Sequence, residues 1–303
     1  MVFVLALAAS LANALTSVFQ RMGVEQAPAA STLRLSLLTY ALRRRVWLLV
    51  FALMIVSFLC QAVALHFGRL SQVQPVLTTE LVFLVVILAV YFRFTIGRRE
   101  WLGALAVTGG LAGFLYFAHP QYGTLSPPLW EWIVVGGACS GAMAIAVALA
   151  MRGPAWWRAA MFGTAAAIGF AFTAACTKAV AGFAASDWAS LYRHWQTYAL
   201  AFFGALAVFL AQNAFHAGPI VASQSTLVLV DPLASILIGV GLFGDNLQTS
   251  GAWGPLEALS LLVTFIGAFS LAHSPLVSGM KGDNEQYREL LSQRLAADRQ
   301  GGR

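Results

Sequence analysis

Apolar runs separated by short polar breaks cover almost the whole chain. A helix that crosses the hydrocarbon core of a bilayer needs about 20 mainly apolar residues, and most of these runs have about that length. In lipid, a spanning segment must satisfy its own backbone donors and acceptors, so the runs predict helices rather than strands. The breaks place ten helices near residues 2–20, 28–42, 46–67, 71–92, 101–118, 129–151, 159–183, 194–216, 220–243 and 255–273.

The basic residues decide whether the short run at 28–42, which carries Arg34, counts as a span. Lys and Arg gather in the cytoplasmic loops of membrane proteins. With ten spans and a cytoplasmic N-terminus, most of the 18 basic residues fall on the cytoplasmic side, whereas nine spans would divide them almost evenly. We therefore expect ten spans in the inner membrane of a bacterial cell, with both termini in the cytoplasm. The cytoplasmic basic residues of this topology are Arg43, Arg44, Arg45, Arg93, Arg98, Arg99, Arg152, Arg158, Lys281, Arg288, Arg294, Arg299 and Arg303, and those of the outer loops are Arg21, Arg69 and Arg193.

The composition fits an all-α polytopic membrane protein, because 59% of the residues are hydrophobic and only 10% are charged. In a soluble protein the net charge of +6 would suggest a nucleic-acid partner, but here the topology accounts for it. Cys60, Cys139 and Cys176 fall in separate apolar runs without metal-ligand spacing, which favours packing roles. We expect no nucleic acid and no cofactor, and the sequence leaves a metal site undefined.

Two short stretches recur at a separation of 151 residues. The tetrapeptide FLCQ ending at Gln61 recurs as FLAQ ending at Gln212, and the same offset relates Glu80 to Asp231. Two repeats of five helices would lie in opposite orientations, as in many secondary transporters, and would bring the fourth and ninth helices together near the midplane. We expect a first repeat over 1–120, a second over 121–275, and a polar cytoplasmic tail over 276–303.

Glu80 and Asp231 are the main candidates for a substrate or ion site. Each lies about ten residues into its predicted helix and therefore near the midplane, where a charged side chain costs at least ~2.5 kcal/mol on insertion scales. Such carboxylates usually face a cavity and can exchange protons or hold a cation. The alternative is that each is a hydrogen-bonded carboxylate that ties helices together.

Other polar residues share helical faces with these carboxylates and are expected to line the same site. Prolines in both helices predict breaks of the kind that mark transporter binding sites, with ordinary kinks as the alternative. Polar residues on the first, third and eighth predicted helices are further candidates, although such residues also hold helices together without binding anything. The candidates are Gln72 and Thr79 with Pro75, Gln224 and Ser235 with Pro232, Asn13 and Ser17 on the first helix, and Gln61 and Gln212.

Lys178 and Arg34 are the basic residues that fall within predicted helices. Lys178 lies near the outer end of its helix, so its long side chain is expected to reach the membrane interface. The alternative is a salt bridge to Glu80 or Asp231. An anionic substrate is the less favoured role for Arg34.

The chain resembles the drug/metabolite transporter (DMT, EamA-like) superfamily, in particular its actinobacterial-type members related to the NIPA magnesium-transporter branch. The resemblance is strongest over residues 68–75 and 79–83, and in the second half over 217–219, 230–233 and 242–245. This chain has Gly244-Asp245 where the family more often has Gly-Glu. The resemblance implies ten helices in a five-plus-five inverted repeat and is weakly specific for any substrate.

These patterns predict a secondary transporter that moves a small solute or cation by alternating access, with coupling through Glu80 and Asp231. The alternative is a flippase or exporter of a lipid-linked or amphipathic substrate. An intramembrane enzyme is disfavoured because the sequence has no His-Glu-x-x-His or Gly-x-Ser-x-Gly motif, and a purely structural protein would leave both carboxylates unexplained. The expected partners are membrane lipid and the transported small molecule or cation, with a homodimer left open.

Overall fold

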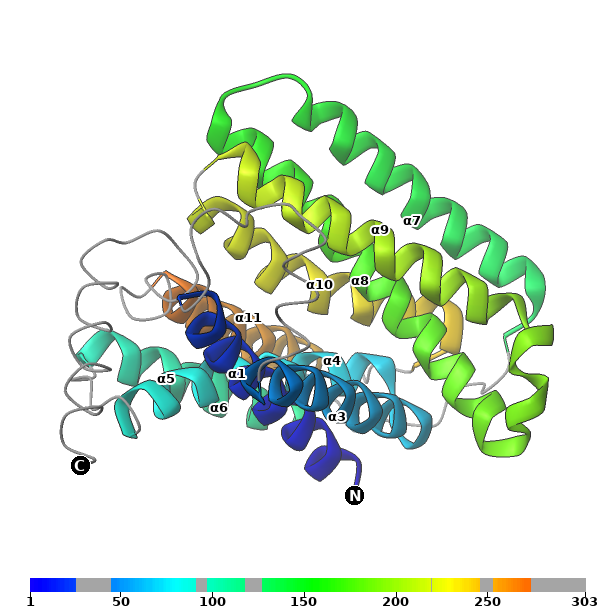
Figure 1. Ribbon diagram of the computed structural model, residues 1–303, viewed down its shortest axis with the longest axis horizontal. Helices are drawn as coiled ribbons and strands as arrows, with labels where there is room; N and C mark the ends of the chain where they lie inside the picture. The colour runs from blue at the N-terminus through cyan, green and yellow to red at the C-terminus, as the bar shows by residue number, and fades with distance from the viewer. Residues whose placement is uncertain (26–44, 91–96, 118–126, 219, 246–252, 274–303) are drawn as a thin grey trace.

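The computed structural model describes residues 1–25, 45–90, 97–117, 127–218, 220–245 and 253–273, which form helices and no strand. The helices form two groups in space (Figure 1), one containing α7 to α10 and the other containing α1, α3 to α6 and α11. The elements are α1 (Val2–Glu25), α3 (Arg45–Phe67), α4 (Leu70–Leu77), α5 (Glu80–Val90), α6 (Arg98–Phe117), α7 (Leu129–Ala150), α8 (Ala155–Ser186), the short 3₁₀ helix η2 (Trp188–Arg193), α9 (Trp195–Ala217), α10 (Ile220–Phe243) and α11 (Trp253–Ala272).

Within the described ranges, nine helical segments are long and apolar enough to cross a membrane, with α4 and α5 together forming one of them. The chain is therefore a multi-pass membrane protein. Large apolar side chains such as Ile55, Ile133 and Ile266 are about 60% exposed, as expected of surfaces that face lipid. The helix predicted at 28–42 and the tail predicted at 276–303 lie outside the described residues.

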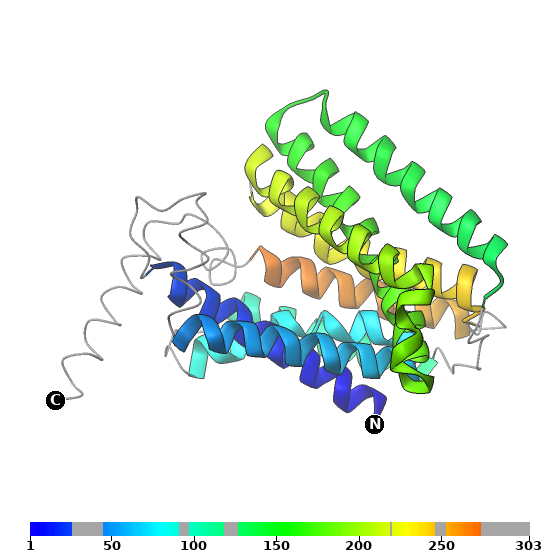
Figure 2. The same cartoon turned by 45° about the vertical axis from the view of Figure 1, so that its right-hand side comes forward.

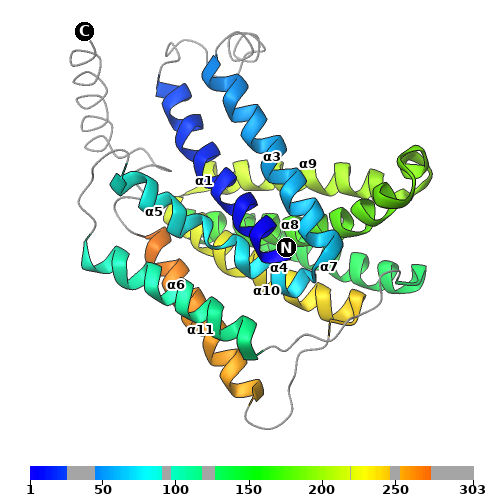
Figure 3. The same ribbon diagram turned by 90° about the horizontal axis from the view of Figure 1, so that it is seen from below.

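Small residues allow the helices to approach closely. α6 and α11 lie side by side (Figure 3), and glycines from both helices form their contact. A Cβ atom on Gly110 would lie 2.6 Å from the Thr264 backbone nitrogen, and one on Gly267 would lie 2.7 Å from that of Val107. α8 is rich in buried alanines and packs against α7, α9 and α10 (Figure 2). Close packing of this kind replaces the hydrophobic effect as the source of helix association in lipid.

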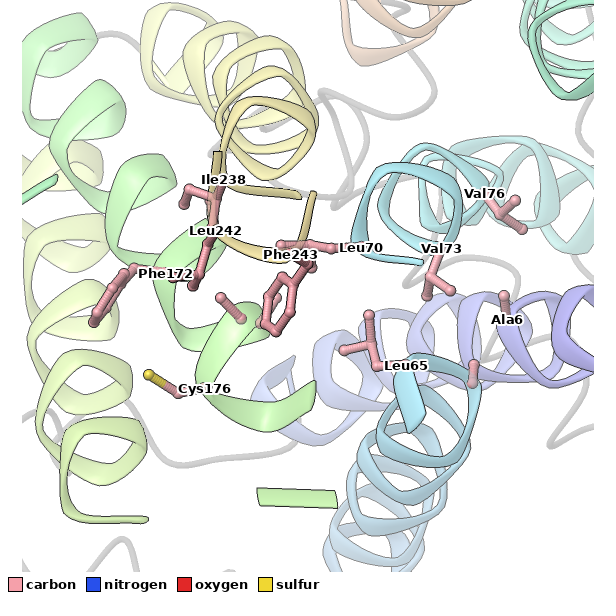
Figure 4. Packing of buried hydrophobic residues seen from close by; sticks show 14 of the residues in the cluster. Ala6, Leu65, Leu70, Val73, Val76, Phe172, Cys176, Ile238, Leu242 and Phe243 are labelled. Atoms are coloured by element: carbon pink, nitrogen blue, oxygen red, sulfur yellow. The ribbon is translucent and has the colours of Figure 1, made fainter. Parts of the chain in front are cut away.

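The largest apolar cluster joins the two groups of helices. It includes Leu70 and Val73 of α4, Leu242 and Phe243 of α10, and Phe172 of α8, all nearly inaccessible (Figure 4). The start of α4 therefore lies against the end of α10 through dense apolar contacts.

The two predicted proline breaks have different outcomes. The helix that contains Pro75 ends at Leu77 and resumes as α5 at Glu80, so two residues, Thr78 and Thr79, separate α4 from α5. α10 instead runs through Pro232 without interruption from Ile220 to Phe243, which corrects the break predicted there. A proline removes only its own amide donor, so the flanking turns can keep their hydrogen bonds and the helix can continue.

Candidate functional site

A cavity of about 580 Å³ lies among α1, α3, α4, α5, α8, α9 and α10. Both carboxylates face it, together with side-chain amides, threonines and three phenylalanines. The first half of the chain contributes Asn13, Phe58, Gln61, Gln74, Leu77, Thr78, Glu80 and Leu81, and the second half contributes Phe170, Thr173, Ala174, Thr177, Val208, Ala211, Gln212, Phe215, Leu227, Val228, Asp231 and Pro232.

Each carboxylate has a serine neighbour that supplies a long hydrogen bond. The Ser17 hydroxyl on α1 donates to Glu80 Oε1 at 3.4 Å. The Ser235 hydroxyl, one turn along α10, donates to Asp231 Oδ1 at the same distance. These distances exceed the usual 2.5–3.0 Å range for such bonds, so both carboxylates keep acceptor capacity for a ligand. Ser17 and Ser235 thus position the two carboxylates through hydrogen bonds, and neither serine is among the residues that line the cavity.

Glu80 reaches the cavity because it is the first residue of α5 after the helix break. The Thr78 and Thr79 hydroxyls each donate at 2.7 Å to the carbonyl oxygen three residues earlier, on Pro75 and Val76. Hydroxyls that bond to nearby carbonyls in this way offer the backbone an alternative to the helical pattern. Ser10 of α1 supplies further hydrogen bonds to the polar groups at the break. Its Oγ lies 3.0 Å from the Leu77 carbonyl oxygen, to which it donates, and 2.8 Å from Thr79 Oγ1.

Three predicted amide side chains line the cavity. Asn13 Oδ1 lies 2.7 Å from the Ser57 hydroxyl, which holds the α1 side chain against α3. Gln61 is partly buried and Gln212 is exposed. Neither of these two glutamines has its polar head fixed by a hydrogen bond to a described residue. They can therefore turn toward a ligand.

Two further predicted residues, Gln72 and Thr79, are buried away from the cavity, with Thr79 engaged in the helix break. The prediction for Gln224 falls on a side chain outside the described part of the structure. The Gln72 prediction assumed one regular helix over 71–92, and the break between α4 and α5 changes which residues share a face with Glu80.

Residues that the sequence patterns did not single out also line the cavity. Gln74 lies on α4, six residues before Glu80, a spacing that one continuous helix would place on a different face, so helical periodicity did not reveal it. Thr173 and Thr177 form a polar stripe on α8, where the apolar composition of the helix hid them. Their hydroxyls donate to carbonyls one turn back on α8, at 2.7 Å and 2.8 Å, so each oxygen can still accept a hydrogen bond from the cavity.

The charged groups of the cavity are all acidic, because none of its described lining residues is Lys, Arg or His. Lys178 follows Thr177 on α8, yet its ammonium group points away from the cavity. It donates to the carbonyl oxygens of Leu65, at 3.2 Å, and Gly68. The alternative salt bridge to a cavity carboxylate is therefore wrong, because the free carbonyls at the end of α3 bind the ammonium group instead. The expected interfacial position stays a prediction.

Comparisons with known proteins give a relative but no function. No family model matches the chain, and no solved structure matches it. The chain is 26% identical over 281 residues to a protein of Corynebacterium glutamicum that is described as uncharacterized. The alignment covers 91% of this chain and 96% of the relative, so the similarity extends over the helical body. In the described residues, His, Cys, Asp and Glu do not gather in groups of three that could hold a metal ion.

Proposed function

We propose that the chain is a secondary membrane transporter of ten spans, built from two inverted five-helix repeats, that carries a small cationic solute by alternating access. The observation that carries this proposal is that Glu80 and Asp231, related by the offset of 151 residues, line one cavity between helices of the two halves. Ionisable residues within membrane helices usually face such cavities and take part in transport.

The lining of the cavity supports the repeat beyond the two carboxylates. Gln61 and Gln212, which have the same offset, both line it. The residue three positions before each carboxylate and the residue directly after it also line the cavity in both halves. The equivalent lining pairs are Gln61 with Gln212, Leu77 with Val228, Glu80 with Asp231 and Leu81 with Pro232.

The packing of the helices also favours two related halves. In a five-plus-five repeat, the helix that contains α4 and α5 corresponds to α10, and α6 corresponds to α11. Both corresponding pairs are in contact, α4 with α10 and α6 with α11. A pseudo-twofold axis would bring equivalent helices together in this manner, and transporters of this kind bind their substrates at the interface of the repeats.

The chemistry of the cavity favours a cation. Two carboxylates and several carbonyl or hydroxyl oxygens face a space that no described basic side chain lines. Phe58, Phe170 and Phe215 add aromatic surface, and the faces of aromatic rings attract cations. An organic ammonium ion of moderate size would match both features.

The proposal is tested with purified protein in two steps. Thermal stabilisation is first measured with a panel of amines, amino acids, lipid head groups and Mg²⁺. The ligands that stabilise are then assayed for uptake into proteoliposomes. We expect ammonium compounds to stabilise the protein, and we expect Glu80→Gln and Asp231→Asn to reduce uptake by about 100-fold or more, since each removes a charge that pairs with the substrate.

Glu131→Gln is the matched control, because Glu131 is a carboxylate in the first turn of α7 that does not line the cavity. Its uptake should equal that of the parent. Unchanged uptake in both the Glu80 and the Asp231 variants would refute the carboxylate mechanism. Stabilisation by lipid head groups alone would favour a flippase instead.

A further inference from the structure

Side chains from the second half hold both helix ends of the hairpin formed by α3 and α4. Lys178 of α8 donates to the carbonyl oxygens of Leu65 and Gly68, where α3 ends. The Asp245 carboxylate, just beyond α10, accepts hydrogen bonds from the Ser71 amide at 3.1 Å and the Ser71 hydroxyl at 2.7 Å, where α4 begins.

The sign of each charge matches the helix end that it meets. The last carbonyls of a helix lack partners within the helix and carry partial negative charge, which a cation satisfies. The first amides carry partial positive charge, which an anion satisfies. Lys178 is 8% exposed and Asp245 is 2% exposed, so water screens neither contact strongly.

Two glycines allow Asp245 to reach α4. Gly244 has a φ of 63°, the left-handed conformation that commonly ends a helix, and it turns the chain so that the Asp245 amide donates to the Gly239 carbonyl at 3.0 Å. Gly239 leaves the space for the carboxylate, since a Cβ atom there would lie 2.6 Å from Asp245 Oδ2 and 3.1 Å from the Ser71 nitrogen. The local sequence is thus built around the contact between α10 and α4.

A layer of apolar side chains packs beside these polar contacts, between α3, the start of α4 and the end of α10, and Figure 4 shows it from close by. The Lys178 ammonium lies 5.2 Å from the centre of the Phe243 ring, which belongs to this layer. On α4 the lining of the cavity begins at Gln74, beyond the layer, and on α8 it ends at Thr177. We refer to this layer as the apolar seal, which consists of Leu65, Leu70, Val73, Ile238, Leu242 and Phe243.

We propose that Lys178 and Asp245 form a two-point latch that holds this end of the cavity closed, and that the cavity opens to this face of the membrane when the latch is released. The inference rests on the proposed function, because alternating access requires a contact that closes one face and can break. α3 and α4 belong to the first half, and Lys178 and Asp245 belong to the second. Release of the two side chains therefore frees one half to move relative to the other. In the topology expected from the basic residues, this is the outer face.

Thiol accessibility tests the latch without a substrate. In a background with all three native cysteines replaced by alanine, Gln74→Cys places a reporter at the first cavity-lining position beyond the seal. A membrane-impermeant charged maleimide is applied to vesicles of each orientation. Trp188→Cys, on the exposed η2 next to the end of α8, identifies the face on which the latch lies.

We expect slow labelling of Gln74→Cys from the latch face in the parent. Lys178→Met and Asp245→Ala should each accelerate it by about tenfold or more, since each removes a charged hydrogen-bonding group that stabilises only the closed state. Lys178→Arg should remain slow because it keeps a cation at the end of α3. Asp187→Asn is the control, an exposed carboxylate that accepts its hydrogen bond from the Ala189 amide of η2 rather than from α3 or α4.

Parent-like labelling from the latch face in both Lys178→Met and Asp245→Ala would overturn the latch. Equal acceleration in Lys178→Arg or Asp187→Asn would also overturn it, because the effect would then not depend on the two caps. This test and the uptake test fail separately. Fast labelling together with uptake that is insensitive to Glu80→Gln and Asp231→Asn would preserve the latch and remove the proposed carboxylate mechanism.

Discussion

The two ends of α4 are built in opposite ways. At its start, the Ser71 amide and hydroxyl both bind the Asp245 carboxylate, and densely packed side chains surround them. At its end the helix stops at Leu77, and among the described residues Glu80 beyond it receives a single hydrogen bond, from Ser17 at 3.4 Å. Both regions contain a buried or partly buried carboxylate, yet only one of the two has its hydrogen bonds well satisfied within the protein.

This difference separates a structural carboxylate from a candidate functional one. A carboxylate with short hydrogen bonds from backbone and side chain stabilises the arrangement around it. One with a long single bond, beside a cavity, has capacity left for a ligand. We therefore expect substitutions in the seal to act on stability, and substitutions in the cavity to act on transport.

The largest stability effect should come from the seal. Phe243→Ala removes a ring that is 1% exposed and packs edge-to-face with Trp132, at 6.0 Å between ring centres. We expect the free energy of unfolding to fall by about 3 kcal/mol, mainly because the missing ring leaves a cavity. Phe58→Ala, which removes a 47% exposed ring of the cavity, should cost less than about 1 kcal/mol. Unfolding of the purified variants in mixed micelles measures both, and equal losses would contradict the contrast between the two regions.

A smaller effect is expected where α10 approaches α4. Gly239→Ala would place a methyl group 2.6 Å from Asp245 Oδ2 and 3.1 Å from the Ser71 nitrogen, so the carboxylate must leave its position on Ser71 and α4 must move back by a few tenths of an ångström. Overpacking of this kind typically costs about 1–3 kcal/mol. Gly241→Ala is the matched control, because a Cβ atom on Gly241 would meet nothing within 4 Å.

The Gly241 control should be neutral or slightly stabilising, since alanine favours a helix by up to about 1 kcal/mol over glycine. Denaturation midpoints of the two variants give the comparison directly. If Gly239→Ala were as stable as Gly241→Ala, the close approach of α4 and α10 would be refuted.

The sequence predicted the helices well because hydrophobicity alone determines where a chain can cross lipid. The bounds predicted for the ninth helix, 220–243, coincide with α10. α8 extends beyond its predicted 159–183 at both ends, to Ala155 and Ser186. Its extra first turn contains Trp156, Trp157 and Arg158, whose side chains end a hydropathy run without ending a helix.

The helix break was predicted less well. Pro75 indicated an interruption, but the helix stops after Leu77, where two threonine hydroxyls bind the carbonyls of Pro75 and Val76. The more informative signal was thus the Thr-Thr pair. Pro232 lacks such a pair after it, and α10 continues through it.

The partners of Lys178 and Asp245 could not be read from the sequence. Lys178 binds carbonyls more than 100 residues away, and Asp245 binds Ser71 across 174 residues. Asp245 follows a glycine at the end of an apolar run and is typical of a solvated loop by pattern alone. Asp245 is buried because distant helices pack around it, and the local pattern of apolar and polar residues does not reveal such packing.

The smallest effects should distinguish the serines that serve the two kinds of carboxylate. Ser71→Ala removes the 2.7 Å bond to buried Asp245, and hydrogen bonds to charged groups contribute about 1.5–3 kcal/mol when short and well formed. The Ser71 amide still binds the carboxylate in this variant, so we expect the free energy of unfolding to fall by about 1.5 kcal/mol, the lower end of this range. Ser17→Ala removes only the 3.4 Å bond to partly exposed Glu80 and should cost less than about 0.5 kcal/mol.

The two variants should affect transport through different steps. Ser17→Ala frees Glu80 at the cavity, so uptake should change although the free energy of unfolding hardly does. Ser71→Ala leaves the cavity lining unchanged and should alter uptake only by loosening the latch. Unfolding in mixed micelles and uptake into proteoliposomes, measured on the same preparations, provide the two values. A larger stability loss in Ser17→Ala than in Ser71→Ala would mean that Glu80 is the structural carboxylate and Asp245 is not, because stability follows the bonds that the folded state makes best.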